Sequence, residues 1–270
     1  MIFLFPFFRD ALLGSLLVSV LCAVIGTFMV TRRAVIAGGG MAHASLGGVG
    51  LGAWLGFSPL WGAALFAVAS GFGIKWLERH SRVREDSAIA MLWTFGMALG
   101  ILFAWLTPGF MTDLPAYLFG DVLAVTPADI LITGILAAVC GVLYVLCLPV
   151  LVLVAYDAEF ARTRRIPVRA VETVMTVLTA LTIVACLRTV GIVLVISLLT
   201  VPQVTAALFV RTFGRMVVLS AVLAYAACVA GLCLSFIFGI PSGATIILVS
   251  ILLYLVCRTI KTLRSRFLKV

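Results

Sequence analysis

Charged side chains are scarce in this chain and absent from long stretches of it. Only 11% of its 270 residues are Asp, Glu, Lys or Arg, against about 25% in an ordinary soluble domain. No Asp, Glu, Lys, Arg or His occurs in segments 11–31, 87–112, 130–156, 189–210 and 216–257. About 20 apolar residues are enough for a helix to cross a bilayer. These runs exclude a water-soluble fold and predict an all-α integral membrane protein.

Short motifs that mark enzymes are absent as well. No Gly-x-x-x-x-Gly-Lys-Ser/Thr phosphate loop is present, so the chain is not expected to hydrolyse ATP. His-Glu-x-x-His, Gly-x-Ser-x-Gly and Cys-x-x-Cys are also missing, and the only histidines are His43 and His80. The seven cysteines lie in or beside apolar runs, where they are expected to pack as small apolar residues. We therefore expect neither an enzyme nor a permanently bound cofactor.

The apolar runs divide the chain into candidate membrane spans. We expect nine spans, with eight as the alternative, in a single transmembrane domain of residues 1–270. Their approximate bounds are 10–31, 35–57, 60–78, 88–106, 127–155, 171–187, 189–210, 215–238 and 242–258. The two spans between residues 170 and 211 are the hardest to delimit, because both must fit between basic loops.

The net charge of +9 gathers beside the ends of these spans. If the loop of Arg32 and Arg33 is cytoplasmic, alternation places 17 of the 19 Lys and Arg residues on that side. Only Arg9 and Arg188 then lie outside. Cytoplasmic loops carry such an excess of basic residues. The pattern predicts an outer N-terminus and a cytoplasmic C-terminus, and it argues against a nucleic-acid-binding surface.

His43 is the only ionisable residue between positions 34 and 74, and it lies in a glycine-rich run. Ionisable groups inside a membrane are costly and usually face a cavity or a partner, and neutral imidazole binds first-row transition metals. Small residues at every fourth position form a ridge that lets another helix approach closely; they are Ala44, Gly48, Gly52 and Gly56. Two interpretations stay open: His43 is a metal ligand, or it hydrogen-bonds to a neighbouring helix.

Residues 156–168 form a short charged segment between two spans, which Pro167 ends. Asp157 and Glu159 stand near its start and arginines near its end, an order that suits the helix dipole. A helix on the cytoplasmic face can dock into a partner's groove. The alternative is a solvated loop whose arginines anchor it at the membrane.

The span 189–210 contains several polar residues around a proline. Pro202 leaves backbone carbonyls unpaired at membrane depth, which is tolerated where neighbours or a water-lined cavity satisfy them. Ser197, Thr200 and Gln203 are therefore candidates for lining a pathway. A proline kink that is capped by threonine hydroxyls explains the same residues equally well.

Five segments carry a resemblance to a known family over nearly the whole chain. They are Ala-Leu-Leu-Gly-Ser-Leu-Leu at 11–17, the Gly/His/Ala run around His43, Asp-Ala-Glu-Phe-Ala-Arg at 157–162, Val-Gly-Ile-Val-Leu-Val at 190–195 before Pro202, and Pro-Ser-Gly-Ala-Thr at 241–245. In this order they resemble the membrane permease subunit of metal-ion ATP-binding-cassette importers. That family takes up zinc, manganese and iron chelates.

The resemblance implies partners and roles for particular residues. The chain would work as a pair in a bacterial plasma (inner) membrane, with two cytoplasmic ATPase subunits and an external metal-binding protein. Segment 156–168 would couple the ATPase to the permease through Asp157, Glu159, Ala161, Arg162 and Arg165. Metal would pass between the two copies, with one His43 from each as a transient ligand. Asp113 and Asp121, on the outer side, would receive the cation or contact the binding protein, unless they are ordinary solvated carboxylates.

Two positions depart from the family pattern. Many relatives have Asp four residues before the histidine, where this chain has Gly39, and many have Gly where it has Arg165. Without the carboxylate a site is softer and less suited to manganese, which prefers oxygen ligands, whereas imidazole suits zinc. We therefore expect zinc as the cargo. The alternative function is a secondary metal transporter or channel that needs no ATPase.

Overall fold

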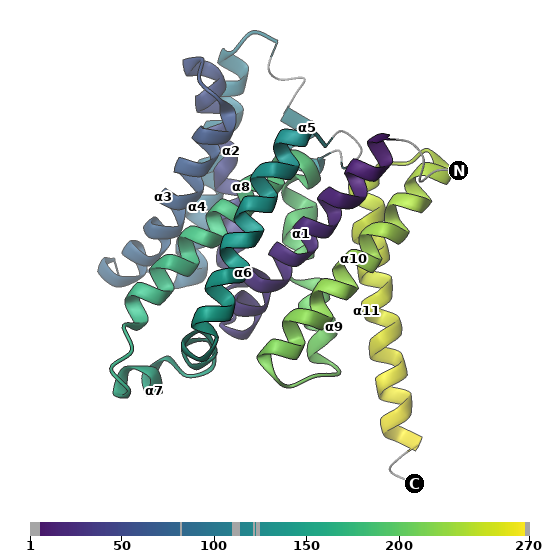
Figure 1. Ribbon diagram of the computed structural model, residues 1–270. Helices are drawn as coiled ribbons and strands as arrows, with labels where there is room; N and C mark the ends of the chain where they lie inside the picture. The colour runs from purple at the N-terminus through teal and green to yellow at the C-terminus, as the bar shows by residue number, and fades with distance from the viewer. Residues whose placement is uncertain (1–5, 82, 110–113, 121, 123–124, 268–270) are drawn as a thin grey trace.

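The computed structural model describes residues 6–81, 83–109, 114–120, 122 and 125–267 (Figure 1). All regular secondary structure in these residues is helical, as predicted. The helices are α1 (Pro6–Thr31), α2 (Val35–Leu55), α3 (Pro59–His80), α4 (Glu85–Leu106), α5 (Leu114–Phe119), α6 (Pro127–Tyr156), α7 (Ala158–Thr163), α8 (Val168–Leu198), α9 (Val201–Ala207), α10 (Phe213–Phe238) and α11 (Ser242–Phe267). We call the end of the bundle that carries the α1–α2 loop, α7 and the end of α11 the basic end.

Seven candidate membrane spans are present in the described residues. They are α1, α3, α4, α6, α8 together with α9, α10 and α11. Helix α2 is long enough, at 21 residues, but its many glycines and His43 keep it out of this apolar group. The protein is thus a membrane protein with several spanning helices, and the predicted count of nine is not confirmed.

Helix α8 contains a sharp break rather than the loop that we expected near Arg188. Gly191 has φ 74° and ψ 166°, a backbone conformation that is essentially restricted to glycine. The helix continues to Leu198, and α9 follows after a turn. Arg188 stays helical and lies 3.8 Å from the carboxylate of Asp129 at the start of α6. The predicted spans 171–187 and 189–210 were therefore divided three residues too early.

The short helix α5 sits on this break. A methyl group at Gly191 would overlap the backbone at Phe119 and Gly120, and a methyl group at Gly120 would overlap the backbone of Val190. Gly120 also has a positive φ of 65°. Two glycines thus let the backbones of α5 and α8 approach more closely than any side chain would permit.

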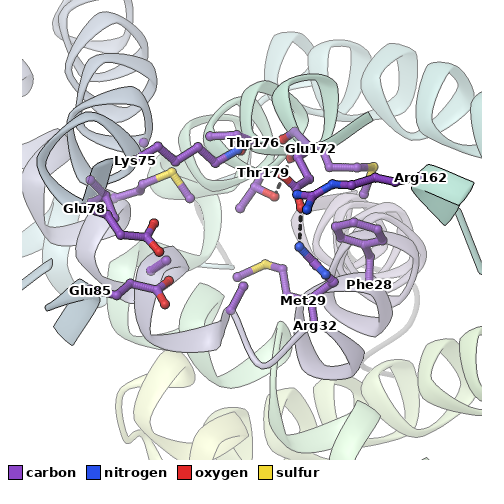
Figure 2. Close-up of a pocket in the computed structure, with 16 residues that line it drawn as sticks. Phe28, Met29, Arg32, Lys75, Glu78, Glu85, Arg162, Glu172, Thr176 and Thr179 are labelled. Carbon is purple, nitrogen blue, oxygen red and sulfur yellow. Dashed lines mark hydrogen bonds and ion pairs between the residues drawn. The ribbon is translucent and has the colours of Figure 1, made fainter. Parts of the chain in front are cut away.

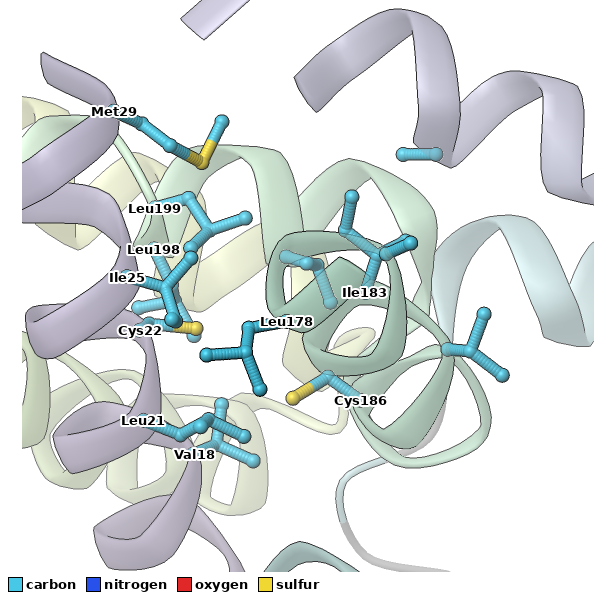
Figure 3. Packing of buried hydrophobic residues seen from close by; sticks show 14 of the residues in the cluster. Val18, Leu21, Cys22, Ile25, Met29, Leu178, Ile183, Cys186, Leu198 and Leu199 are labelled. Carbon is cyan, nitrogen blue, oxygen red and sulfur yellow. The ribbon is translucent and has the colours of Figure 1, made fainter. Parts of the chain in front are cut away.

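The core lies between α1 and α8 (Figure 3). Val18, Leu21 and Ile25 of α1 are fully buried and face α8, which contributes Leu178 and Ile183. In the most apolar stretch of α1, 72% of the residues are buried, against 17% in α6 and 22% in both α4 and α11. The exposed apolar faces of these outer helices are the surfaces that a bilayer would cover.

Helix α2 packs against α3 and α4 through glycines. A side chain at Gly48 would collide with the carbonyl of Gly62 on α3, and one at Gly50 would collide with Gly100 on α4. Without a hydrophobic driving force between helices in lipid, such close contact stabilises a membrane helix pair through dispersion. The three helices α2, α3 and α4 therefore form a tightly packed unit that carries His43.

Candidate metal pathway and coupling segment

The predicted small-residue ridge is divided between two neighbouring helices. Ala44 contacts α4, whereas Gly48 and Gly52 contact α3. Gly56, which the sequence pattern placed on the same ridge, packs against nothing. It ends α2 as a left-handed cap with φ 76°, and no atom lies within 4 Å of a Cβ built there. The expectation of helix packing at Gly56 is corrected accordingly, because the helix stops one residue before it.

His43 lies in the middle of α2 and stacks on Trp93 of α4. The two ring centroids are 4.2 Å apart and the planes differ by 5°. The Nδ1 atom of His43 is buried and has no hydrogen-bond partner among the described residues. Trp93 is held in turn, since its indole N–H donates to the sulfur of Met97 at 2.9 Å. The imidazole is thus fixed by stacking rather than by a hydrogen bond, which does not support the second interpretation of His43.

Gly39 lies one helical turn before His43, so the two residues share a face of α2. The residue is buried, yet a Cβ at this position would meet no atom within 4 Å. The site therefore has room for a side chain next to His43. A carboxylate is missing there because of the residue type and not because of crowding.

A complete metal site is not formed within the described part of one chain. No group of three or more His, Cys, Asp or Glu side chains gathers among those residues. Asp113 and Asp121 lie outside the described residues. Within residues 35–74 and 87–106 of the α2–α3–α4 unit, His43 is the only Asp, Glu or His side chain, and a single ligand needs a second source of donors.

The three polar candidates around the α8–α9 turn differ in their hydrogen bonds. Gln203 is fully buried, and its amide donates to the carbonyls of Cys22 on α1 and Leu198 at 2.8 and 3.0 Å. Thr200 donates back to Ile196 at 2.8 Å, and the Ser197 hydroxyl is buried without a partner among the described residues. The Thr200 hydroxyl thus satisfies a carbonyl beside the α8–α9 break, as the kink interpretation predicted for threonine, and Gln203 satisfies the Leu198 carbonyl there while it ties α9 to α1.

The charged segment 156–168 contains α7, a helix of six residues at the basic end. Asp157 caps it by accepting the backbone N–H of Phe160 at 2.9 Å. Glu159 and Arg162 form an ion pair at 2.5 Å with both side chains largely exposed. Ala161 is fully buried beneath them. The segment is a folded, capped helix with a charged outer face, and not an irregular loop.

Arg165 ends this segment in a left-handed conformation, with φ 58°. Glycine adopts that conformation without cost, whereas other residues lose roughly 1–2 kcal/mol. The turn geometry that the missing glycine put in question is therefore preserved. The backbone N–H of Arg165 donates to the carbonyl of Arg162 at 2.9 Å.

A cavity of about 410 Å³ lies directly behind α7 at the basic end (Figure 2). Arg162 of α7 lines it together with residues from α1, α3, α4 and α8. Glu78 and Glu85 face each other on one side, and Glu172 of α8 lies on the other side. The cavity thus lies between α7 and the α2–α3–α4 unit, and the start of α8 contacts α3 beside it.

Glu172 ties the start of α8 to two other elements. Its carboxylate forms an ion pair with Arg32 in the α1–α2 loop, and both side chains are partly buried. Lys75 of α3 donates to the backbone carbonyl of Glu172 at 3.1 Å and to the Thr176 hydroxyl at 2.6 Å. Sequence reasoning missed Glu172 and Lys75, because their partners are about a hundred or more residues away. The only available signal was the rarity of acidic residues beside spans.

Comparisons with known proteins agree with this arrangement. Residues 4–261 match the model of the ABC 3 transport family. The chain belongs to this family.

Curated relatives cover nearly all of this ABC 3 protein. An uncharacterized membrane protein of Synechocystis sp. is 37% identical over 93% of the chain and 90% of its own length. The manganese transport system membrane protein MntC of Halalkalibacterium halodurans is 35% identical over 93% and 86%. Among solved structures, PsaBC from Streptococcus pneumoniae in complex with Fab matches with a TM-score of 0.86 and 28% identity, over 94% of this chain and 91% of that one. The family resemblance that the five segments carry is thereby confirmed.

Proposed function

We propose that this ABC 3 protein is the transmembrane permease subunit of an ATP-driven metal-ion importer. The observation that carries the proposal is α7, a capped helix with a charged outer face that lies between α6 and α8 at the basic end. A chain without a phosphate loop needs an external source of motion, and α7 offers the surface through which a partner can supply it. The similarity to MntC, a manganese transport system membrane protein, supports a metal as cargo.

The contacts around the cavity provide a route for that motion. Movement of α7 is passed to α8, which follows it after Pro167. From Glu172 the ion pair to Arg32 and the hydrogen bond from Lys75 lead to α1 and α3. An ATPase that closes against α7 would therefore widen or narrow the 410 Å³ cavity. Glu172 is the residue through which motion of α7 and α8 would reach α3, one of the helices that support His43.

We infer a cytoplasmic basic end, an outer N-terminus and nine crossings. The basic-residue bias supports the orientation. The ninth crossing is supported by the break at Gly191, which contacts α5 at the end opposite α7. The chain then returns, because Lys261 near the C-terminal end of α11 donates to the carbonyl of Leu208 just after α9. Residues 168–208 would therefore cross the membrane twice. Together with α2 and the other six spans, this makes nine crossings.

The pathway in this proposal runs between two copies of the chain. One copy offers only His43 within residues 35–74 and 87–106 of the α2–α3–α4 unit, and two copies would supply a pair of these imidazoles. Stacking on Trp93 restricts the ring to one orientation, which lowers the entropy that a ligand loses on binding metal. An external metal-binding protein would deliver the ion, and two cytoplasmic ATPase subunits would bind α7 of the two copies in a bacterial plasma membrane.

Zinc is the cargo that the donor set favours. Imidazole without carboxylate suits zinc, whereas manganese prefers oxygen ligands, and Gly39 leaves the neighbouring position empty. The second candidate is manganese, which the name of the MntC relative favours. Uptake of the two metals through the same reconstituted complex distinguishes them.

Co-purification of the ATPase tests the proposed coupling. A small protein with a phosphate loop should purify with the tagged chain, and Glu159→Arg should abolish its binding. Asp86→Arg is the matched control, because Asp86 is also an exposed acid at the basic end but lies outside α7. Size-exclusion chromatography of both variants checks the fold. The coupling role is refuted if both variants retain the ATPase equally, or if the purified chain alone accumulates metal under an ion gradient.

A further inference from the structure

An apolar cavity of about 230 Å³ lies between α1, α6, α8 and α10, next to the cavity behind α7, with which it shares Phe28 and Met175 as lining residues. Its walls include Ile25, Leu143, Val150, Val174 and Phe213, and none of its lining residues carries a charge. All four helices contribute from their halves near the basic end. The cavity has no part in the proposed metal pathway.

The outer wall of this cavity belongs to helix surface that faces lipid. Val174 on the cavity wall is 48% exposed, and Val145 and Leu146 on the adjoining face of α6 are 71% and 73% exposed. Apolar walls with nothing between them lose dispersion contacts. An apolar cavity of about 150 Å³ stays dry and accepts a benzene molecule. A larger one that borders a bilayer is accordingly suited to a hydrocarbon chain.

One polar group stands within this apolar lining. The ring of Tyr144 stacks near Phe213, with 6.3 Å between centroids. Its hydroxyl lies beside Gly214 at the start of α10, where a Cβ would be 3.4 Å away. The hydroxyl forms no hydrogen bond with any residue that the structure describes. It is available to donate to the ester carbonyl of a lipid.

Positive charge surrounds the same corner of the molecule. Arg211 and Arg215 flank Phe213 in sequence, both are exposed, and neither forms an ion pair within the described part of the chain. Tyr156 at the end of α6 donates to the backbone carbonyl of Arg211 at 3.5 Å, which keeps this loop close to α6. Basic residues at the cytoplasmic surface attract anionic lipid headgroups.

We propose that this cavity binds one anionic phospholipid. One acyl chain fills the cavity, the ester carbonyl accepts a hydrogen bond from Tyr144, and the phosphate lies at Arg211 and Arg215. The hydrocarbon alone gains little over bulk lipid, because lipid tails are as apolar as the cavity walls. Selectivity therefore resides in the headgroup. The lipid would occupy the space between α6, α8 and the start of α10.

A photoreactive phosphatidylglycerol with a diazirine on one acyl chain tests the site. The full complex is placed in vesicles of phosphatidylethanolamine and phosphatidylglycerol and irradiated, and labelled peptides are mapped by mass spectrometry. Label should concentrate on Leu143 and Val174. Val174→Trp should remove it by filling the cavity, whereas Val145→Trp, an equally large addition on lipid-facing α6, should leave it unchanged. Leu143→Phe provides a second filling variant if Val174→Trp does not fold.

Competition identifies the headgroup. Excess unlabelled phosphatidylglycerol should displace the label and excess phosphatidylcholine should not, and Arg211→Gln should reduce that preference about fivefold. Equal labelling of Val145 and Val174 would contradict the proposal, as would equal competition by the two lipids. A cross-link from Val174 to a second copy of the chain would show that protein, not lipid, covers the cavity. None of these readouts depends on the transported metal.

Discussion

Substituting Gly39 by Asp introduces the carboxylate that the family resemblance led us to expect one turn before His43. The change is sterically free, since a Cβ at Gly39 meets no atom within 4 Å. Asp is also at least as good a helix former as glycine. The carboxylate and His43 would lie on the same face of α2, so that both can bind one ion.

The direct attraction between the new carboxylate and the metal ion is large, but the net gain in binding free energy is moderate. At an effective dielectric constant of about 20, a carboxylate and a divalent ion about 4 Å apart attract each other by about 8 kcal/mol. Desolvation of the carboxylate offsets most of this. A net gain of about 1.4 kcal/mol for manganese relative to zinc already shifts the ratio of their transport rates about tenfold. Manganese gains more because it prefers oxygen ligands.

The assay is uptake of radioactive zinc or manganese into vesicles that contain the complete transporter, with the binding protein supplied loaded with one metal at a time. Gly39→Asn is the matched control, because it adds nearly the same volume without the charge. The Asp variant should transport manganese better relative to zinc, and the Asn variant should not. Equal behaviour of the two variants would refute a metal pathway beside His43.

Three further substitutions probe other parts of the structure. His43→Ala should lower metal uptake more than about tenfold, the lower range for loss of a metal-site contact, while the elution volume in size-exclusion chromatography stays that of the unchanged protein. A changed elution volume would instead indicate a packing role. Gly48→Ala should lower the stability of the purified protein by about 1–3 kcal/mol through overpacking, whereas Gly39→Ala on the same helix should not. Equal stability of these two variants would show that the α2–α3 contact is looser than described. Arg165→Gly should raise that stability by about 1 kcal/mol by relieving the left-handed conformation, and Arg165→Val should lower it; the opposite order would contradict the turn.

The spanning helices could be predicted from the sequence because their signal is local. A run such as 130–156 has no charged residue and can only be a membrane helix or a buried one. The helix α7 was recognisable for the same reason, since Asp157, the arginines and Pro167 lie within a few residues of one another. Capping and dipole effects act over a single turn.

Features that depend on distant partners were not predictable. The division between the two spans was assigned to the charged residue Arg188. The backbone instead turns at Gly191, where it contacts the end of α5 closely. Gln203 was proposed to line a pathway, but its partners on α1 are known only from the fold. Glu172 was overlooked, since its ion pair with Arg32 spans most of the chain. Periodicity likewise assigned Gly56 to the ridge, although the helix ends one residue earlier, at Leu55.

The central claim is that this chain moves metal only when an ATPase drives α7. The most direct test is metal accumulation in vesicles that contain the chain, its ATPase and the loaded external binding protein, measured with ATP and with a non-hydrolysable analogue. We predict that metal accumulates with ATP but not with the analogue, and that the Glu159→Arg complex does not accumulate metal with either nucleotide. Equal accumulation with ATP and with the analogue would contradict the account.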